Sequence, residues 1–267
     1  MVTSDLPPLP SISGLPPLPV MGQVHRRPPP GGARREWQSA KVVEIWEESV
    51  NAKTFRFQLH PDTPRHVPGQ HYDVRLTAPD GSQAQRSYSV GSGPSAGGTV
   101  ELSVERIADG DVSPYLHDVI RAGDDVELRG PFGGWFIWRG DTPVLLVGGG
   151  SGVVPLMSML RHWRAIDRPV PLELLVSARS PEDLFYAGDY GDESTVIYTR
   201  KIPPGWGRSP ARLEAMDLQP LVERALLNDR TVAYVCGSSG FAEHASQLLV
   251  ALGIDRAAVR VERFGPA

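Results

Sequence analysis

The stretch Pro143-Val-Leu-Leu-Val-Gly-Gly-Gly-Ser-Gly-Val-Val-Pro155 decides the fold. Its apolar first half is typical of a buried parallel strand. The glycines let the backbone turn sharply and approach a ligand, and Pro155 suits the first turn of a helix. A helix N-terminus favours a phosphate. We therefore predict a dinucleotide pyrophosphate site, with a ligand-free strand–helix turn as the alternative, and these residues as its members: Gly149, Gly150, Ser151, Gly152 and Pro155.

Strands and helices alternate after Thr142. Apolar runs separated by amphipathic stretches predict a doubly wound α/β domain with a mostly parallel sheet. The expected strands are 143–147, 172–177, 195–199, 231–236 and 260–263. The expected helical stretches are 153–165, 181–186, 218–225 and 240–252.

Shorter segments with alternating apolar residues precede this region. The expected strands are 40–46, 54–59, 72–76, 86–90, 100–104 and 125–129. One short helix is expected over 113–120, with Ser113 as its cap and Pro114 at its first position. The pattern favours an antiparallel barrel or sandwich. We predict a β-barrel domain over residues 36–140, an α/β domain over 141–267, and a ligand site in the crevice between them.

Residues 1–35 differ in composition from the rest of the chain. The segment Leu6-Pro-Pro-Leu-Pro10 recurs as Leu15-Pro-Pro-Leu-Pro19, and prolines this dense favour polyproline II over helix or central strand. We expect a disordered tail. A docking segment for a proline-reading partner is the alternative.

Composition excludes several classes of protein. The net charge of −4 argues against nucleic acid as the main partner. No apolar run is long enough to span a membrane, and no signal peptide is visible. Cys236 is the only cysteine, so a disulfide and a cysteine-ligated zinc or iron–sulfur site are excluded within these residues. We expect a cytoplasmic protein without a metal site, whose electrons need an organic cofactor or an outside metal centre.

The glycine loop departs from the common dinucleotide fingerprint. Val153 stands where G-x-G-x-x-G has its third glycine, and the next strand ends Val176-Ser-Ala-Arg-Ser180, without the usual acidic residue. Ser177 and Arg179 suit a ribose 2′-phosphate, because guanidinium binds phosphate oxygens bidentately. Arg200, after a later strand, is a further candidate, or part of a solvated basic turn. The sequence favours NADP, with NAD as the alternative.

Several motifs resemble those of the ferredoxin–NADP reductase superfamily, in the family's order over about residues 38–267. They are Pro68-Gly-Gln70, Arg86-Ser-Tyr-Ser89, Gly148-Gly-Gly-Ser-Gly-Val-Val-Pro155, Cys236-Gly with Phe241, and Glu262-Arg-Phe264. The resemblance implies an FAD-binding barrel followed by a pyridine-nucleotide domain.

For the flavin half, the resemblance implies that Arg86 pairs with the FAD pyrophosphate and Tyr88 lies along the isoalloxazine, in the segment that includes Ser87. It places Ser89 near flavin N5, as a catalytic residue. Gly110-Asp-Val-Ser113 resembles the family's phosphate-binding G-x-x-S/T segment, which includes Val112. A plain strand and a plain helix cap are the alternatives.

For the nicotinamide half, the resemblance places Cys236 and Gly237 beside the ring, with Phe241 following. It implies that Glu262 is a polar neighbour of the ring and that Phe264 stacks over the flavin. Cys236 and Glu262 are the catalytic candidates here, and core packing is the alternative for Cys236 and Phe264. The family proline after Cys-Gly is Ser238 in this chain, which puts the local loop shape in question.

The resemblance implies an FAD-dependent NAD(P)H oxidoreductase that passes hydride to flavin N5. Its electrons are then expected to go to a separate ferredoxin, flavodoxin, haem or molybdenum protein. The alternatives are a free flavin, ferric-chelate or quinone reductase, and an FAD-binding relay or regulatory subunit without turnover alone.

Overall fold

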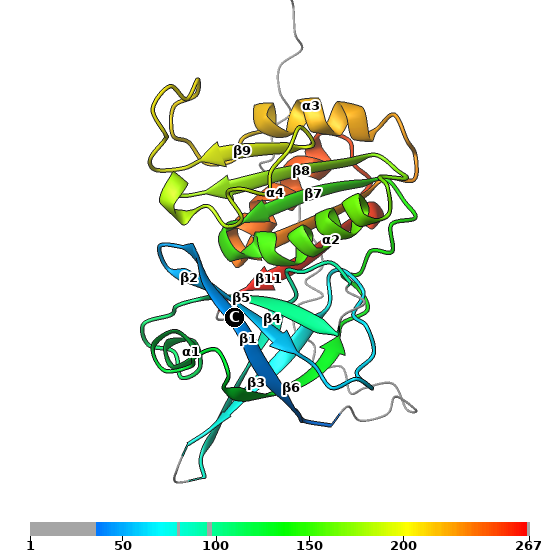
Figure 1. Ribbon diagram of the computed structural model, residues 1–267. Helices are drawn as coiled ribbons and strands as arrows, with labels where there is room; N and C mark the ends of the chain where they lie inside the picture. The colour runs from blue at the N-terminus through cyan, green and yellow to red at the C-terminus, as the bar shows by residue number, and fades with distance from the viewer. Residues whose placement is uncertain (1–35, 79–80, 95–97, 266–267) are drawn as a thin grey trace, which may run out of the picture.

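The computed structural model describes residues 36–78, 81–94 and 98–265, which form two stacked domains (Figure 1). The predicted tail over 1–35 lies outside the described residues. No helix of the described residues is long and apolar enough to cross a membrane.

The first domain is an antiparallel barrel. Its strands are β1 (Gln38–Ser49), β2 (Ala52–Gln58), β3 (His71–Thr77), β4 (Gln83–Ser89), β5 (Thr99–Glu105) and β6 (Asp125–Phe132). They follow the order β4-β3-β6-β1-β2-β5, and a bridge between Val90 and Leu102 joins the two outer strands. Alternate residues such as Phe55 and Phe57 of β2 are buried, so the alternation in the sequence marks the barrel core.

The helix of this domain, α1 (Ser113–Asp118), begins differently from the prediction. Val112 occupies the cap position, without a side-chain hydrogen bond. The Ser113 hydroxyl instead accepts a hydrogen bond from the backbone N–H of Ile107, at 3.0 Å. Ser113 therefore ties the helix to the end of β5, and the predicted cap was wrong.

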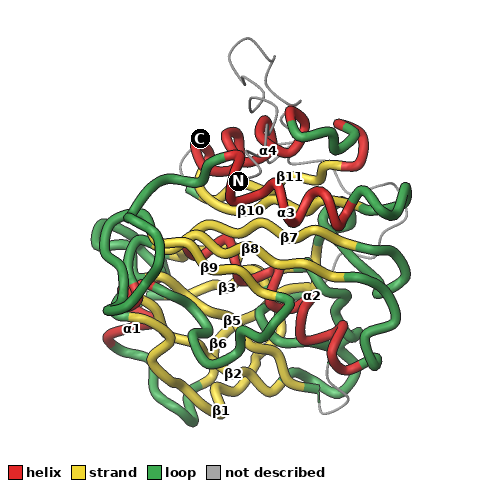
Figure 2. The backbone as a smooth tube through the Cα atoms, turned by 90° about the horizontal axis from the view of Figure 1, so that it is seen from above, coloured by secondary structure: helices red, strands yellow, loops and turns green. Residues whose placement is uncertain are grey.

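The second domain has a fully parallel sheet. Its strands are β7 (Val144–Gly149), β8 (Leu172–Ala178), β9 (Ser194–Tyr198), β10 (Val232–Ser238) and β11 (Val259–Phe264), in the order β11-β10-β7-β8-β9. The helix α2 (Val153–Ala165) packs on the face toward the barrel, while α3 (Ala215–Ala225) and α4 (Ser239–Ala251) cover the other face (Figures 1 and 2). The predicted fold class, a barrel followed by a doubly wound α/β domain, is confirmed.

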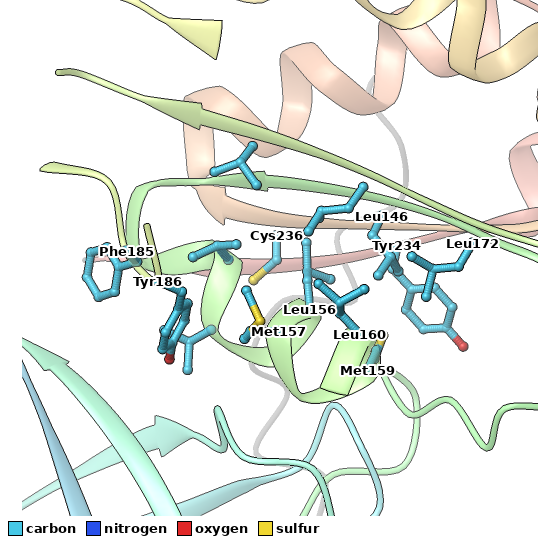
Figure 3. Packing of buried hydrophobic residues seen from close by; sticks show 14 of the residues in the cluster. Leu146, Leu156, Met157, Met159, Leu160, Leu172, Phe185, Tyr186, Tyr234 and Cys236 are labelled. Atoms are coloured by element: carbon cyan, nitrogen blue, oxygen red, sulfur yellow. The ribbon is translucent and has the colours of Figure 1, made fainter. Parts of the chain in front are cut away.

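The helix expected over 181–186 is reduced to a 3-10 turn, η2 (Pro181–Asp183). Further short turns are η1 (Gly150–Gly152) and η3 (Arg256–Ala258). Tyr186 has a φ of 56°, which no continuing helix allows. Its ring belongs to the apolar cluster around α2, and its hydroxyl points toward the barrel (Figure 3).

Candidate functional site

The strand order places a topological switch point at the carboxyl ends of β7 and β10. The chain leaves β7 toward β8 and β9, then returns to the other side of β7 through β10 and β11. Ligands of open α/β sheets bind at such a switch point, beyond the carboxyl ends of the strands. Here the glycine loop after β7 meets the segment Cys236–Ser238 at the end of β10.

The glycines of this loop are required by close packing. A Cβ on Gly152 would overlap the carbonyl group of Cys236 and lie 2.5 Å from the Cα of Gly237. A Cβ on Gly149 would lie 2.7 Å from the Phe241 ring. Gly150 instead has a φ of +55° and open space around its Cα. The loop is thus pressed against β10 on one side and open on the other, as a phosphate cradle requires.

Two helices begin at this crevice. At the start of α2, Gly152 provides no side-chain cap. The Val153 N–H donates to the carbonyls of Gly150 and Ser151, and Pro155 has no N–H group. At the start of α4, the Ser238 hydroxyl accepts a hydrogen bond from the Phe241 N–H at 3.4 Å. The residue that replaces the family proline therefore shapes the loop as a helix cap. Pro155 is buried in the first turn of α2.

The candidates for the adenosine end lie beside one another at the ends of β8 and β9. Ser177 is buried, and the carbonyl of Arg179 accepts hydrogen bonds from the N–H groups of Arg200 and Lys201, at 2.9 and 3.1 Å. Lys201 forms an ion pair with Glu182. Among the described residues, neither Arg179 nor Arg200 forms a salt bridge. Two guanidinium groups without a carboxylate therefore stand where a 2′-phosphate is expected.

The candidates for the nicotinamide end lie on neighbouring strands, near the carboxyl ends of β10 and β11. Cys236 and Glu262 are paired across β10 and β11, and Cys236 is fully buried. The Glu262 Oε2 atom is enclosed and has no hydrogen-bond partner among the described residues. Burial raises the pKa of Glu262 to about 7. Burial, and then the nearby Glu262, raise the pKa of the Cys236 thiol, which disfavours a nucleophilic thiolate.

Phe264, opposite Ser238 across the same two strands, is partly buried against the apolar cluster of α2. The structure therefore brings Phe264 to the crevice, and its stacking role stays a prediction.

The flavin candidates lie along β4. Tyr88 is partly buried against the barrel core, and burial raises the pKa of its hydroxyl, opposed by the positive Arg86. Ser89 is buried at the end of the strand, whereas the Ser87 hydroxyl donates to Asp73 Oδ1 at 2.6 Å. Ser87 thus stabilises the strand, and the roles of Tyr88 and Ser89 at the flavin stay predictions.

Arg86 lies beside the segment Gly110–Ser113. Its guanidinium donates to Asp111 Oδ2 at 3.3 Å, and both side chains are exposed. Gly110 and Val112 stand directly before α1. A group with phosphate oxygens fits this exposed guanidinium, since charge-assisted bonds to phosphate are stronger than a long surface ion pair.

Sequence reasoning missed the polar residues that join the domains. Arg161 on α2 contacts the barrel residues Gly91 and Glu101, and Tyr186 shares a 2.6 Å hydrogen bond with Ser103. The signal in the sequence was slight: Ser158 and Arg161 interrupt the apolar pattern of α2 at a spacing that puts them on one face. Within the described ranges, no group of His, Cys, Asp or Glu side chains is arranged to hold a metal ion.

Comparison with protein families matches both domains. The model for the oxidoreductase FAD-binding domain matches residues 39–137, and the model for the oxidoreductase NAD-binding domain matches residues 146–247.

Curated relatives carry similar names. The chain is 28% identical to the reductase component of propane 2-monooxygenase from Rhodococcus jostii, over 88% of this chain and 65% of that protein. It is also 28% identical to the reductase subunit of glycine betaine monooxygenase from Chromohalobacter salexigens, over 85% of this chain and 64% of that protein. The chain therefore spans a little under two thirds of the length of these relatives.

Solved structures share the fold. The FAD/NAD-binding domain of nitric oxide dioxygenase from Vibrio cholerae has a TM-score of 0.69 at 23% identity, covering 86% of this chain and 99% of that one. The Amycolatopsis cytochrome P450 reductase GcoB has a TM-score of 0.71 at 21% identity, covering 87% and 71%. Because both family models match in this order over the two domains, the chain belongs to the ferredoxin reductase-like family of FAD- and NAD(P)-binding oxidoreductases.

Proposed function

We propose that this protein is an FAD-containing, NADPH-dependent reductase that delivers electrons to a separate redox protein, such as an oxygenase component, a ferredoxin or a haem protein. The observation that carries the NADP preference is the pair of guanidinium groups, Arg179 and Arg200, at the ends of β8 and β9. The one cysteine of residues 1–267 is buried and cannot hold an iron–sulfur cluster, so any metal centre that accepts the electrons lies outside these residues. The relatives named as reductase components support this assignment.

Different residues along the crevice bind FAD and NADPH. Bound FAD supplies the chemistry, because a flavin accepts a hydride and releases electrons singly. Arg86 and the start of α1 hold its phosphates, while Tyr88 and Ser89 orient the ring. Gly150 and the start of α2 hold the NADPH pyrophosphate.

At the ends of β10 and β11, the buried Cys236 and the partly buried Glu262, with its enclosed Oε2 atom, exclude water from the nicotinamide site. Below the pKa of about 7, Glu262 holds a proton on a carboxyl oxygen that can donate to the substrate. We place the activity in the cytoplasm, where the free thiol of Cys236 stays reduced.

The purified protein is expected to be yellow and to lose its flavin absorbance during anaerobic titration with NADPH at a much lower concentration than with NADH. Equal titration by both nucleotides would contradict the NADP assignment. Steady oxidation of NADPH with quinones or ferric chelates, unimproved by any protein acceptor, would identify a reductase of small molecules instead. Bound flavin that NADPH does not reduce would indicate a relay subunit.

Arg179→Ala is expected to raise the KM for NADPH about tenfold, the usual size of a lost charge-assisted hydrogen bond, and to leave the KM for NADH unchanged. Steady-state kinetics with both nucleotides measure this. Arg230→Ala is the matched control, because it removes the same charge from an exposed site before β10, at the opposite edge of the sheet. An equal rise in the KM for NADH would show that Arg179 does not bind the 2′-phosphate.

A further inference from the structure

The helix that begins at the nucleotide loop carries two hydrogen-bond donors aimed at the flavin domain. Ser158 and Arg161 lie three residues apart on α2, so their side chains share one face. The Ser158 hydroxyl donates to the carbonyl of Ser92 at 2.6 Å, and Arg161 Nη1 donates to the carbonyl of Gly91 at 3.0 Å. One helix face thus holds the carbonyls of two consecutive barrel residues.

Those carbonyls belong to the continuation of the flavin strand. Gly91 lies two residues after Ser89, the residue expected near the hydride-accepting atom of the flavin. The Gly91 N–H donates to the carbonyl of Glu101 on β5 at 2.9 Å, so the segment is also fixed to the barrel. A shift of α2 against this segment would shift the nucleotide against the flavin.

The Arg161 guanidinium joins carboxylates of both domains. It donates to Glu101 Oε2 of the barrel at 2.9 Å and, through Nη2, to Asp189 Oδ2 of the nucleotide domain at 2.6 Å. It also lies over the Tyr186 ring, 4.8 Å from its centroid. Arg161 and Glu101 are largely buried, with 25% and 13% of their side chains exposed. Buried bonds of this kind hold a defined geometry better than a surface ion pair does.

The two domains are closely packed where Gly91 meets Tyr186. A Cβ on Gly91 would lie 2.5 Å from the Tyr186 hydroxyl, so the two domains touch closely beside Arg161. The Tyr186 hydroxyl in turn shares its hydrogen bond with Ser103 of β5, at 2.6 Å.

We propose that Arg161, assisted by Ser158, is a positioning residue that sets the distance between the nicotinamide and the flavin by clamping α2 to the Gly91–Ser92 backbone. This inference rests on the proposed function. Hydride transfer depends steeply on such a distance, since a misplacement of about 1 Å can lower a rate about 100-fold. The printed bonds of Ser158 and Arg161 all go to protein groups, so loss of the clamp is expected to change the rate of hydride transfer and to leave nucleotide affinity unchanged.

The test compares Arg161→Met with Arg164→Met. Arg164 lies on the same helix and is also ion-paired, but its partner Glu193 belongs to its own domain. The barrel survives the first substitution, because Glu101 keeps its bonds to Arg56 at 2.7 and 3.0 Å. In anaerobic stopped-flow experiments, Arg161→Met is expected to lower the limiting rate of flavin reduction by NADPH about tenfold. Its Kd for NADPH stays within about twofold of the wild type, and Arg164→Met changes neither value.

A second readout needs no nucleotide. Hydrogen–deuterium exchange at the amides of residues 90–92 is expected to accelerate in Arg161→Met and to remain unchanged in Arg164→Met. An unaltered reduction rate in Arg161→Met, or an equal loss in Arg164→Met, would overturn the proposal. A wild-type protein that NADPH fails to reduce would refute the proposed function instead, while the exchange measurement would still decide whether the clamp exists.

Discussion

Gly152→Ala is expected to abolish reduction of the flavin by NADPH, lowering the rate more than about 100-fold, while the flavin stays bound. The added Cβ would overlap the carbonyl carbon and oxygen of Cys236 and lie 2.5 Å from the Cα of Gly237. These are backbone atoms at the end of a central strand, so they cannot turn aside as a flexible side chain would. The loop must move outward, and the phosphate cradle and the nicotinamide site separate.

The measurement is anaerobic reduction of the purified variant by NADPH, together with its flavin absorbance and its melting temperature. Gly240→Ala is the control, because Gly240 also lies on a helix, and a Cβ there meets no atom within 4 Å. That variant is expected to reduce at the wild-type rate and to be slightly more stable, since alanine favours helices over glycine. Wild-type reduction of Gly152→Ala would show that the nucleotide binds elsewhere.

The sequence predicted the features that depend on local patterns. The glycine loop, the bounds of α2 over Val153–Ala165 and the approximate position of every strand follow from apolar periodicity and helix-starting residues. The motifs along the chain also predicted the family, because their residue types and order are specific. Ser177, Arg179 and Arg200 could also be predicted to lie together. Parallel strands all have their carboxyl ends on one side of the sheet, and these residues lie at the ends of β8 and β9.

The errors arose where a partner outside the element overrides a local rule. Ser113 looked like a helix cap, but its hydroxyl bonds to Ile107, which precedes it. Residues 181–186 begin like a helix, but the Tyr186 N–H donates to Glu48 Oε1 at 2.8 Å and its hydroxyl bonds to Ser103. Both partners belong to the barrel, far away in sequence. The contact of Arg161 with Gly91 could not be predicted for the same reason, since no residue near Arg161 in the sequence indicates it.

Glu262 is expected to make the folded protein less stable as the pH rises from about 4.5 to about 7, and to have no further effect above that range. Its carboxyl has a pKa of about 7 in the folded state, because burial disfavours the ionised form, against 4.5 in the unfolded chain. Between these values the folded state holds a proton that the unfolded state has released, so stability falls with increasing pH. At about 1.4 kcal/mol per pKa unit, the full loss is roughly 3 kcal/mol.

Glu262→Gln removes this dependence, because the amide has nearly the shape of the protonated carboxyl and does not ionise. The variant should match the wild type near pH 4.5 and exceed it by roughly 3 kcal/mol above pH 7, or several degrees in melting temperature. Thermal melts without pyridine nucleotide, from pH 4.5 to 8, measure the difference. Glu243→Gln is the control, since Glu243 pairs with Arg263 on the outer face.

The pH profile also tests the role of Glu262 in the crevice. The Oε2 atom of Glu262 is enclosed and has no hydrogen-bond partner among the described residues, which destabilises the folded protein unless a ligand supplies the missing hydrogen bond. The nicotinamide carboxamide offers both a donor and an acceptor, so bound NADP should reduce the difference between wild type and Glu262→Gln above pH 7. If the two proteins instead lose stability in parallel from pH 4.5 to 8, Glu262 is already ionised and partnered. The crevice would then have no unsatisfied carboxyl for the nicotinamide to complete.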